Sequence, residues 1–118
     1  QKIFYKDAHS NYVTVNPSYA QDFNLSPEDF PGKTDFDLFS QDLALKYRKD
    51  DQKIMQAGKI KSFDEGYLTG NKHYTVHTVK VPLKNTKGEP AGLLGIFWDI
   101  TERVKTLQKL KDTRPLKK

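Results

Sequence analysis

Residues 92–103 pass without a loop from an apolar run into charged sequence with helical spacing. Residues 92–98 suit a buried β-strand, and Asp99-Ile100-Thr101 marks the change. We predict that Thr101 is the N-cap of the helix, because its hydroxyl can accept a hydrogen bond from an unpaired N–H of the next turn. A core strand that continues directly into an exiting helix couples the two mechanically. This junction points to a sensor or relay domain.

The sequence before this junction predicts a hairpin and then a block of helices. Short β-rich runs at residues 3–5 and 12–15 predict the hairpin. Helix-start signals follow at Asn16-Pro17 and at Ser26-Pro27, where proline suits the first helical position. The longest helix is predicted over residues 41–57, after a serine and before a closing glycine.

Strand patterns return after this helix. Residues 63–69 and 73–83 flank Gly70-Asn71, a two-residue turn signal, and a further turn at residues 85–88 leads into the junction strand. Strands at both ends of a helical block favour antiparallel pairing over βαβ units. The order predicts an α+β fold, in which a five-stranded antiparallel sheet carries short helices on one face and a C-terminal exit helix.

Composition bounds the class of protein. The 118 residues suit one domain with a modest core, and no apolar stretch approaches the roughly 20 residues that span a bilayer. We expect a cytoplasmic domain, cut from a longer protein because the chain starts with Gln1. Much of the net charge of +5 lies after residue 102, without the aromatic and basic pattern of a nucleic-acid surface. Nucleic-acid binding is therefore not expected.

Several segments in the right order resemble a PAS domain over residues 2–103. These are Tyr12-Val13-Thr14-Val15-Asn16-Pro17, Gly32-Lys33-Thr34-Asp35-Phe36-Asp37-Leu38-Phe39, Ala57-Gly58, Lys80-Val81-Pro82-Leu83 and Asp99-Ile100-Thr101-Glu102-Arg103. The resemblance is to PAS domains of bacterial sensor histidine kinases and diguanylate cyclases. It implies a PAS sensory domain over residues 1–103, with residues 104–118 starting a linker or signalling helix to an output domain.

The resemblance implies that the domain binds a small ligand or cofactor, or only dimerises. It also implies a signal relay through Asp99, Ile100 and Thr101 to the C-terminal output domain. A sensor histidine kinase is the first expectation for the parent protein, and a diguanylate cyclase is the alternative. A ligand-free dimerisation module is the competing function. No catalytic constellation is found, so the domain itself is not expected to be an enzyme.

The predicted pocket lies between the long helix and the sheet. Side chains expected to face it alternate on two strands and recur on the helix: Tyr47, Ile54, Val76, Thr78, Lys80, Leu93, Gly95 and Phe97. Gly95 would leave space there. An inward Lys80 would pair with an anionic ligand, because a buried ammonium needs a partner. The alternative is a packed core with Lys80 extending to solvent.

The opposite face of the last strand carries an apolar stripe of Leu94, Ile96 and Trp98. Together with Val104 and Leu107 on the exit helix, it predicts an interaction surface and a homodimer of the full protein. The alternative is that the chain's own flanking segments cover this stripe, or that the exit helix is a frayed linker docked on the domain.

Cofactor and metal chemistry find little support in the sequence, and the cofactor stays unknown. The lack of cysteine excludes a covalent flavin adduct and a cysteine-linked chromophore, and the long helix has no histidine to ligate haem. His73 and His77 lie on a predicted strand, roughly 13 Å apart and too far to share a metal. The aspartates at helix starts and faces are interpreted as caps and dipole partners: Asp35, Asp37, Asp42, Asp50 and Asp51.

Overall fold

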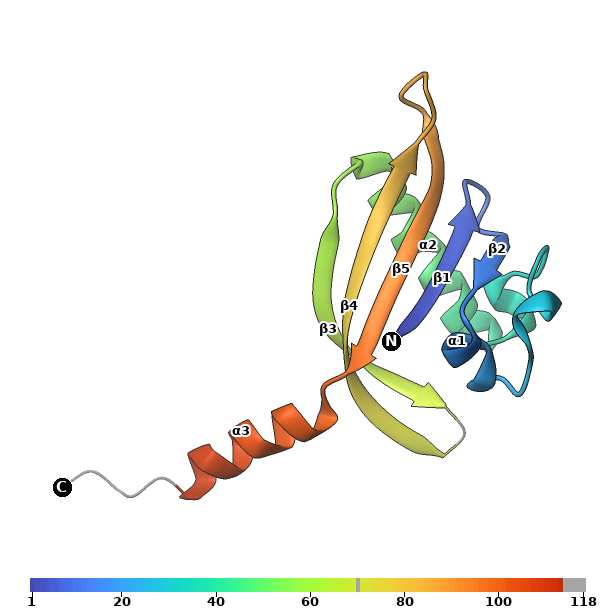
Figure 1. The fold of residues 1–118 in the computed structure, drawn as a ribbon. Coiled ribbons are helices and arrows are strands. Elements are labelled where there is room, and N and C mark those ends of the chain that lie inside the picture. The colour runs from blue at the N-terminus through green and yellow to red at the C-terminus, as the bar shows by residue number, and fades with distance from the viewer. Residues whose placement is uncertain (70, 114–118) are drawn as a thin grey trace.

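The computed structural model describes residues 1–69 and 71–113, with the arrangement shown in Figure 1. Five strands form one antiparallel sheet in the order β2-β1-β5-β4-β3. The strands are β1 (Lys2–Asp7), β2 (Tyr12–Val15), β3 (Lys61–Thr69), β4 (Lys72–Lys84) and β5 (Pro90–Asp99). The helices are α1 (Pro17–Gln21), α2 (Gln41–Ala57) and α3 (Thr101–Thr113), with short 3-10 turns η1 (Pro27–Asp29) and η2 (Asp35–Asp37). The predicted fold class is confirmed.

The sheet places the first and last strands of the domain side by side. β1 pairs with β5 in a register that runs from Lys2 opposite Phe97 to Asp7 opposite Gly92. β5 also pairs with β4 along its length, so it lies at the centre of the sheet. A displacement of β5 therefore alters its contacts with both β1 and β4.

The long helix α2 has the ends that the sequence predicts. Ser40 Oγ accepts a hydrogen bond from the N–H of Leu43 at 3.4 Å, and Gly58 ends the helix with a φ of 68°. This left-handed conformation favours glycine because it has no Cβ. In Figure 1, α2 lies behind the strands, whereas α1 and the 3-10 turns lie beside β1 and β2. The predicted turn at Gly70-Asn71 includes Gly70, which lies outside the described residues.

Aromatic side chains dominate the core between the sheet and the short helices. Tyr19 on α1 packs against five other rings, with centroid distances between 5.2 and 5.9 Å. Edge and tilted contacts of this kind stabilise beyond the area that they bury. Phe23, which lies just beyond the end of α1, belongs to this group.

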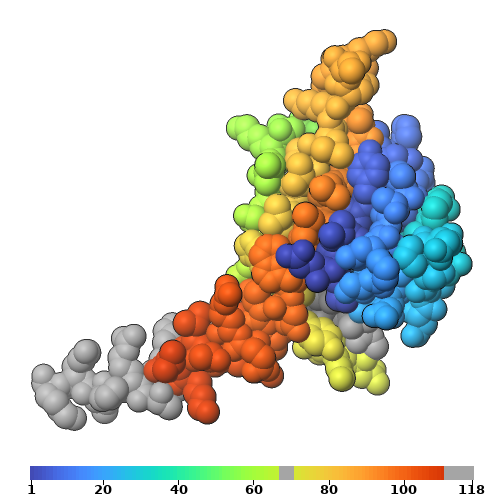
Figure 2. Space-filling view, viewed as in Figure 1, coloured from blue at the N-terminus to red at the C-terminus, as the bar shows by residue number. Residues whose placement is uncertain are grey.

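The other face of the sheet is left open by the helices. Leu94, Ile96 and Trp98 on β5 are half-buried, whereas Leu93 and Phe97, which alternate with them, are buried on the helical side. In the view of Figure 2, strands occupy the middle of the visible surface, the blue and cyan residues of α1 and the short turns lie at its right, and α3 projects away from the body. None of the helices described is long and apolar enough to cross a membrane.

Candidate functional site

A cavity of about 40 Å³ lies between the helices and the inner face of the sheet. This space holds about three water molecules, if each needs 10–15 Å³. Six aromatic rings line it, from Phe4, Tyr12, Tyr19, Phe39, Tyr47 and Phe97. Its other lining residues are Lys6, Asp35, Glu65, Val76, Thr78 and Lys80. The cavity is thus an aromatic chamber with charged groups in its wall.

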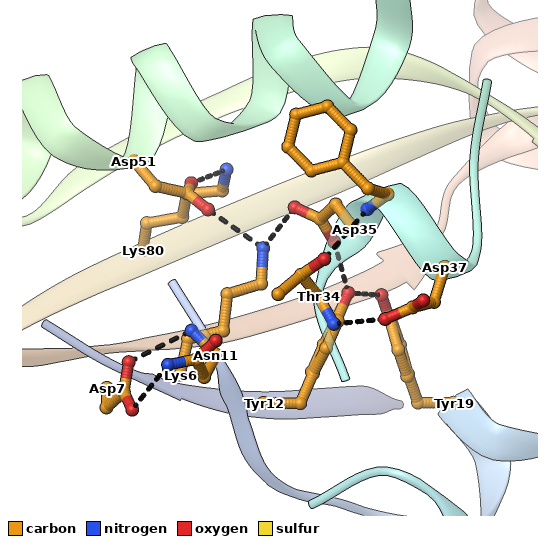
Figure 3. Close-up of polar contacts among 11 residues, drawn as sticks. Lys6, Asp7, Asn11, Tyr12, Tyr19, Thr34, Asp35, Asp37, Asp51 and Lys80 are labelled. Atoms are coloured by element: carbon orange, nitrogen blue, oxygen red, sulfur yellow. Dashed lines mark hydrogen bonds and ion pairs between the residues drawn. The ribbon is translucent and has the colours of Figure 1, made fainter. Parts of the chain in front are cut away.

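Lys6 on β1 joins two aspartates from different elements (Figure 3). Its Nζ donates to Asp35 Oδ2 at 2.6 Å and to Asp51 Oδ2 at 2.9 Å. The three residues are between 0% and 4% exposed. Charges at this depth require partners, and here each is paired within the chain. Asp35 and Asp51, which we interpreted as caps and dipole partners, are buried ion-pair partners of Lys6.

Asp51 also pairs with Lys80 of β4, whose Nζ donates to Asp51 Oδ1 at 2.7 Å. Lys80 is only 7% exposed, so its ammonium does not reach solvent as the packed-core alternative requires. The expectation of an anionic ligand rested on an unpaired ammonium at this position. Asp51 supplies that partner from within the chain, so the reason for an anion no longer holds.

A chain of hydroxyl groups extends the network to α1. Tyr12 donates to Asp35 Oδ1 at 2.5 Å, and the Tyr12 and Tyr19 hydroxyl oxygens lie 2.6 Å apart. Because Tyr12 has one proton and gives it to Asp35, Tyr19 is the donor to Tyr12. Burial raises the pKa of Tyr12 well above its usual value, and the neighbouring Tyr19 and Asp35 add to this rise. The Tyr12 ring therefore stays neutral at physiological pH.

Glu65 on β3 brings a third carboxylate to the cavity. Its Oε2 accepts a hydrogen bond from Thr78 Oγ1 at 2.9 Å, and its side chain is half-buried. In the described part of the chain, no lysine, arginine or histidine lies within 4 Å of it. Burial, followed by the charge of Glu65 and then of Asp35, raises the pKa of Tyr47 to about 12. The carboxylates of the cavity wall thus add to the effect of burial at Tyr47.

The structure brings five of the eight predicted pocket residues to the cavity wall: Tyr47, Val76, Thr78, Lys80 and Phe97. Two others, Ile54 and Leu93, pack with Met55 in a separate buried cluster and do not line the cavity. Gly95 does not line it either, because the Phe4 ring lies over the position that a Cβ would occupy. The space that we predicted at Gly95 is filled by that ring.

The sequence analysis did not single out Lys6, Asp35 or Glu65 as pocket residues. Lys6 lies two residues after Phe4 on β1, so both side chains are on the inner face. A charged residue in phase with buried positions is a signal for an internal ion pair. Its partners follow Lys6 by 29 and 45 residues and could not be assigned from spacing.

The strand-to-helix junction is fastened to β4. Thr75 donates its N–H to Thr101 Oγ1 at 2.8 Å, and its carbonyl accepts from the N–H of Ile100 at 2.8 Å. The prediction that Thr101 caps the helix is wrong, because its hydroxyl serves β4 and Thr101 is the first helical residue. Asp99 Oδ1 instead accepts from the N–H of Thr101 at 2.8 Å. Hydrogen bonds from the Thr101 side chain and backbone lower the pKa of Asp99.

Two known proteins are similar to this chain in sequence. The methanogenesis regulatory histidine kinase FilI of Methanothrix harundinacea is 33% identical over 100 residues, which are 85% of this chain and 11% of FilI. A diguanylate cyclase of Vibrio cholerae is 27% identical over 111 residues, which are 92% of this chain and 35% of the cyclase. The chain therefore spans a minor part of both relatives.

A solved structure agrees with these matches. VqmA, a protein of Vibrio cholerae, was solved bound to DPO, with a TM-score of 0.75 and 21% identity, covering 86% of this chain and 52% of that chain. At this identity the likeness shows the fold alone. The sequence model of the PAS fold matches residues 1–105, nearly the whole chain. By this match and by its five-stranded architecture, the chain belongs to the PAS-fold family.

Proposed function

We propose that this PAS domain senses a ligand in its cavity and relays the bound state through α3 to a C-terminal output domain. One observation carries the proposal: Thr75, which holds Ile100 and Thr101, directly precedes Val76 in the cavity wall. Phe97 lines the same cavity two residues before Asp99. A ligand that displaces these strands therefore acts on both attachments of the exit helix. A few kcal/mol of difference between two states suffices to switch an output.

The relatives support this assignment. FilI is a histidine kinase, and the match to it makes a sensor histidine kinase our first proposal for the parent protein. The match to a diguanylate cyclase keeps that output as the alternative. VqmA was solved with the small molecule DPO, so a ligand is compatible with this fold. The relay residues of our proposal are Asp99, Ile100 and Thr101.

We further propose that the full protein is a homodimer. The apolar stripe of Leu94, Ile96 and Trp98 lies on the open face of the sheet, and Leu107 on α3 is 57% exposed. Val104 lies one turn before Leu107 and is half-buried. A second copy of the chain covers such self-complementary surfaces in a closed assembly. VqmA, which has the same fold, is described as a dimer.

The relay can be tested in the full parent protein without knowing its ligand. Val76→Ile adds one methylene group to the cavity wall and imitates partial occupancy. We expect this variant to change the kinase or cyclase output, and we expect Thr101→Ala to abolish that change. Ile60→Val, at an exposed position away from the cavity, is the matched control.

Two results would overturn the relay. One is an output of Val76→Ile equal to that of the unaltered protein, with the domain folded by circular dichroism. The other is a Val76→Ile effect that persists in the double variant with Thr101→Ala. The first result would favour the ligand-free dimerisation module.

A further inference from the structure

The charges around the cavity do not balance. Two ammonium groups, Lys6 and Lys80, face the three carboxylates of Asp35, Asp51 and Glu65. The two aspartates each contact an ammonium group at 2.9 Å or less, whereas Glu65 has no cation within 4 Å in the described chain. One negative charge is therefore left at the cavity wall. No donor among the described residues contacts Glu65 Oε1, because Thr78 donates to Oε2.

The aromatic lining is suited to a positive charge. Ring faces attract cations through their quadrupole when the charge lies within about 6 Å of the centroid. Lys6 already shows this property, because its Nζ lies 5.0 Å from the centroids of both Phe4 and Tyr12. Tyr47 lies in the same wall, and the carboxylates around it disfavour its ionisation. The wall therefore combines an unpaired carboxylate with rings that tolerate a neighbouring cation.

We propose that the cavity binds a small organic ammonium ion, with Glu65 as its counter-ion. This inference rests on the proposed sensing function and names the class of ligand. Asp35 and Asp51 already compensate Lys6 and Lys80, so an anion would add a further negative charge beside Glu65 without a matching cation, which is costly. An ammonium group instead completes the pairing of Glu65. At about 40 Å³ the cavity accepts only a few heavy atoms, and larger amines require the walls to move apart.

Three probes of similar size and different charge test the class of ligand: methylammonium chloride, methanol and sodium formate. Each is titrated into the ¹⁵N-labelled chain at constant ionic strength set by potassium chloride, and the amide shifts of Val76 and Thr78 are followed. We expect saturable shifts with methylammonium alone, in the millimolar range because the ligand has only two heavy atoms. Glu65→Gln retains an oxygen acceptor and should weaken binding by about tenfold. Glu28→Gln, at an exposed carboxylate, should leave it unchanged.

The outcomes separate the ligand class from the relay. Saturable binding of formate or methanol at these amides, or equal methylammonium affinity in Glu65→Gln, would overturn the ammonium site while the sensing function stands. If none of the three probes binds saturably, the ammonium site is also overturned. In a further outcome, the chain binds methylammonium while Val76→Ile leaves the output of the parent protein unchanged. This result would support the ammonium site and overturn the relay.

Discussion

Lys6 is the residue on which the polar interior depends. Its ammonium lies between Asp35 of η2 and Asp51 of α2, while its own backbone belongs to the central part of the sheet. Buried ion pairs contribute little net stability when they replace well-packed apolar groups, but breaking one leaves a charge uncompensated. Lys6 therefore specifies how the helical block sits on the sheet.

Replacing Lys6 by Met should destabilise the domain strongly. The change removes the shared cation and leaves Asp35 and Asp51 facing each other with less compensation, at a cost of about 3–5 kcal/mol in the free energy of unfolding. Urea unfolding followed by circular dichroism measures it. Lys46→Met is the matched control, because the Lys46–Asp50 pair is exposed with an N–O distance of 3.7 Å, and should cost less than about 1 kcal/mol. Equal losses in both variants would contradict this role of Lys6.

The buried charges mark the limit of prediction at this scale. Binary patterning finds buried apolar positions well, and it placed Val76 and Phe97 correctly on the inner face. It does not identify buried lysine and aspartate residues, and Asp51 was therefore interpreted as a cap or dipole partner rather than as an ion-pair partner of Lys6. Whether such a residue is buried depends on a partner distant in sequence, as Lys6 is from Asp51.

At the scale of elements, β1 approaches β5 closely at Gly95. The Phe4 ring lies over Gly95, which is its partner in the β1–β5 register. This close approach holds the first strand against the last, where the relay begins. The arrangement explains why a side chain at position 95 is excluded although the backbone there is ordinary strand.

Gly95→Ala should therefore destabilise the domain. The added Cβ collides with the Phe4 ring, and overpacking of this kind costs about 1–3 kcal/mol. Phe4→Leu combined with Gly95→Ala should lose less than the sum of the single changes, because the smaller side chain relieves the collision. Gly66→Ala on β3 is the control, since nothing lies within 4 Å of its Cβ position. Thermal unfolding of the four variants measures these losses in stability. Strict additivity of the Phe4→Leu and Gly95→Ala losses in the double variant would contradict the contact.

Acid should loosen the start of α3. The pKa of Asp99 is lower in the folded chain than its usual value of 3.8, because Thr101 donates to its carboxylate. Its stabilising contribution is thus complete above pH 3.8 and is lost as the pH falls through the lower folded value. Asp99 is exposed, so the effect is small, on the order of 0.5 kcal/mol.

The Cα chemical shifts of Glu102 and Arg103 measure this loss as the pH is lowered from 5. Asp99→Asn, which cannot titrate, should show a smaller change over that range. The two proteins differ only at position 99, so the difference between their profiles isolates Asp99. Identical pH profiles would contradict the assignment.

The ends of elements were predictable where a single residue type determines them. Ser40 caps the start of α2 and Gly58 ends the helix, as expected, because capping and the left-handed glycine act locally. The N-cap assignment of Thr101 failed for the opposite reason. Its hydroxyl is equally able to accept from a neighbouring strand, and the position of Thr75 beside it is a property of the sheet.

At the scale of the whole molecule, the sheet separates two surfaces with different roles in our proposal. Its inner face carries the cavity and the ion network, and its outer face carries the apolar stripe. β5 contributes to both, since Phe97 lines the cavity and Ile96 and Trp98 lie on the outer face. A ligand that shifts β5 would thereby alter the proposed dimer contact as well as the exit helix.

The proposed dimer predicts that the chain associates through this outer face. Sedimentation velocity should show concentration-dependent dimer formation, and Ile96→Lys should shift the chain to monomer because a charge is then desolvated in the contact. Ile60→Lys is the control, since Ile60 is 67% exposed and borders Lys53 and Ile54 on the helical side. Ile60→Lys should associate like the unaltered chain. Association that survives Ile96→Lys would place the contact elsewhere, whereas a chain that stays monomeric at all concentrations would assign dimer formation to other parts of the parent protein.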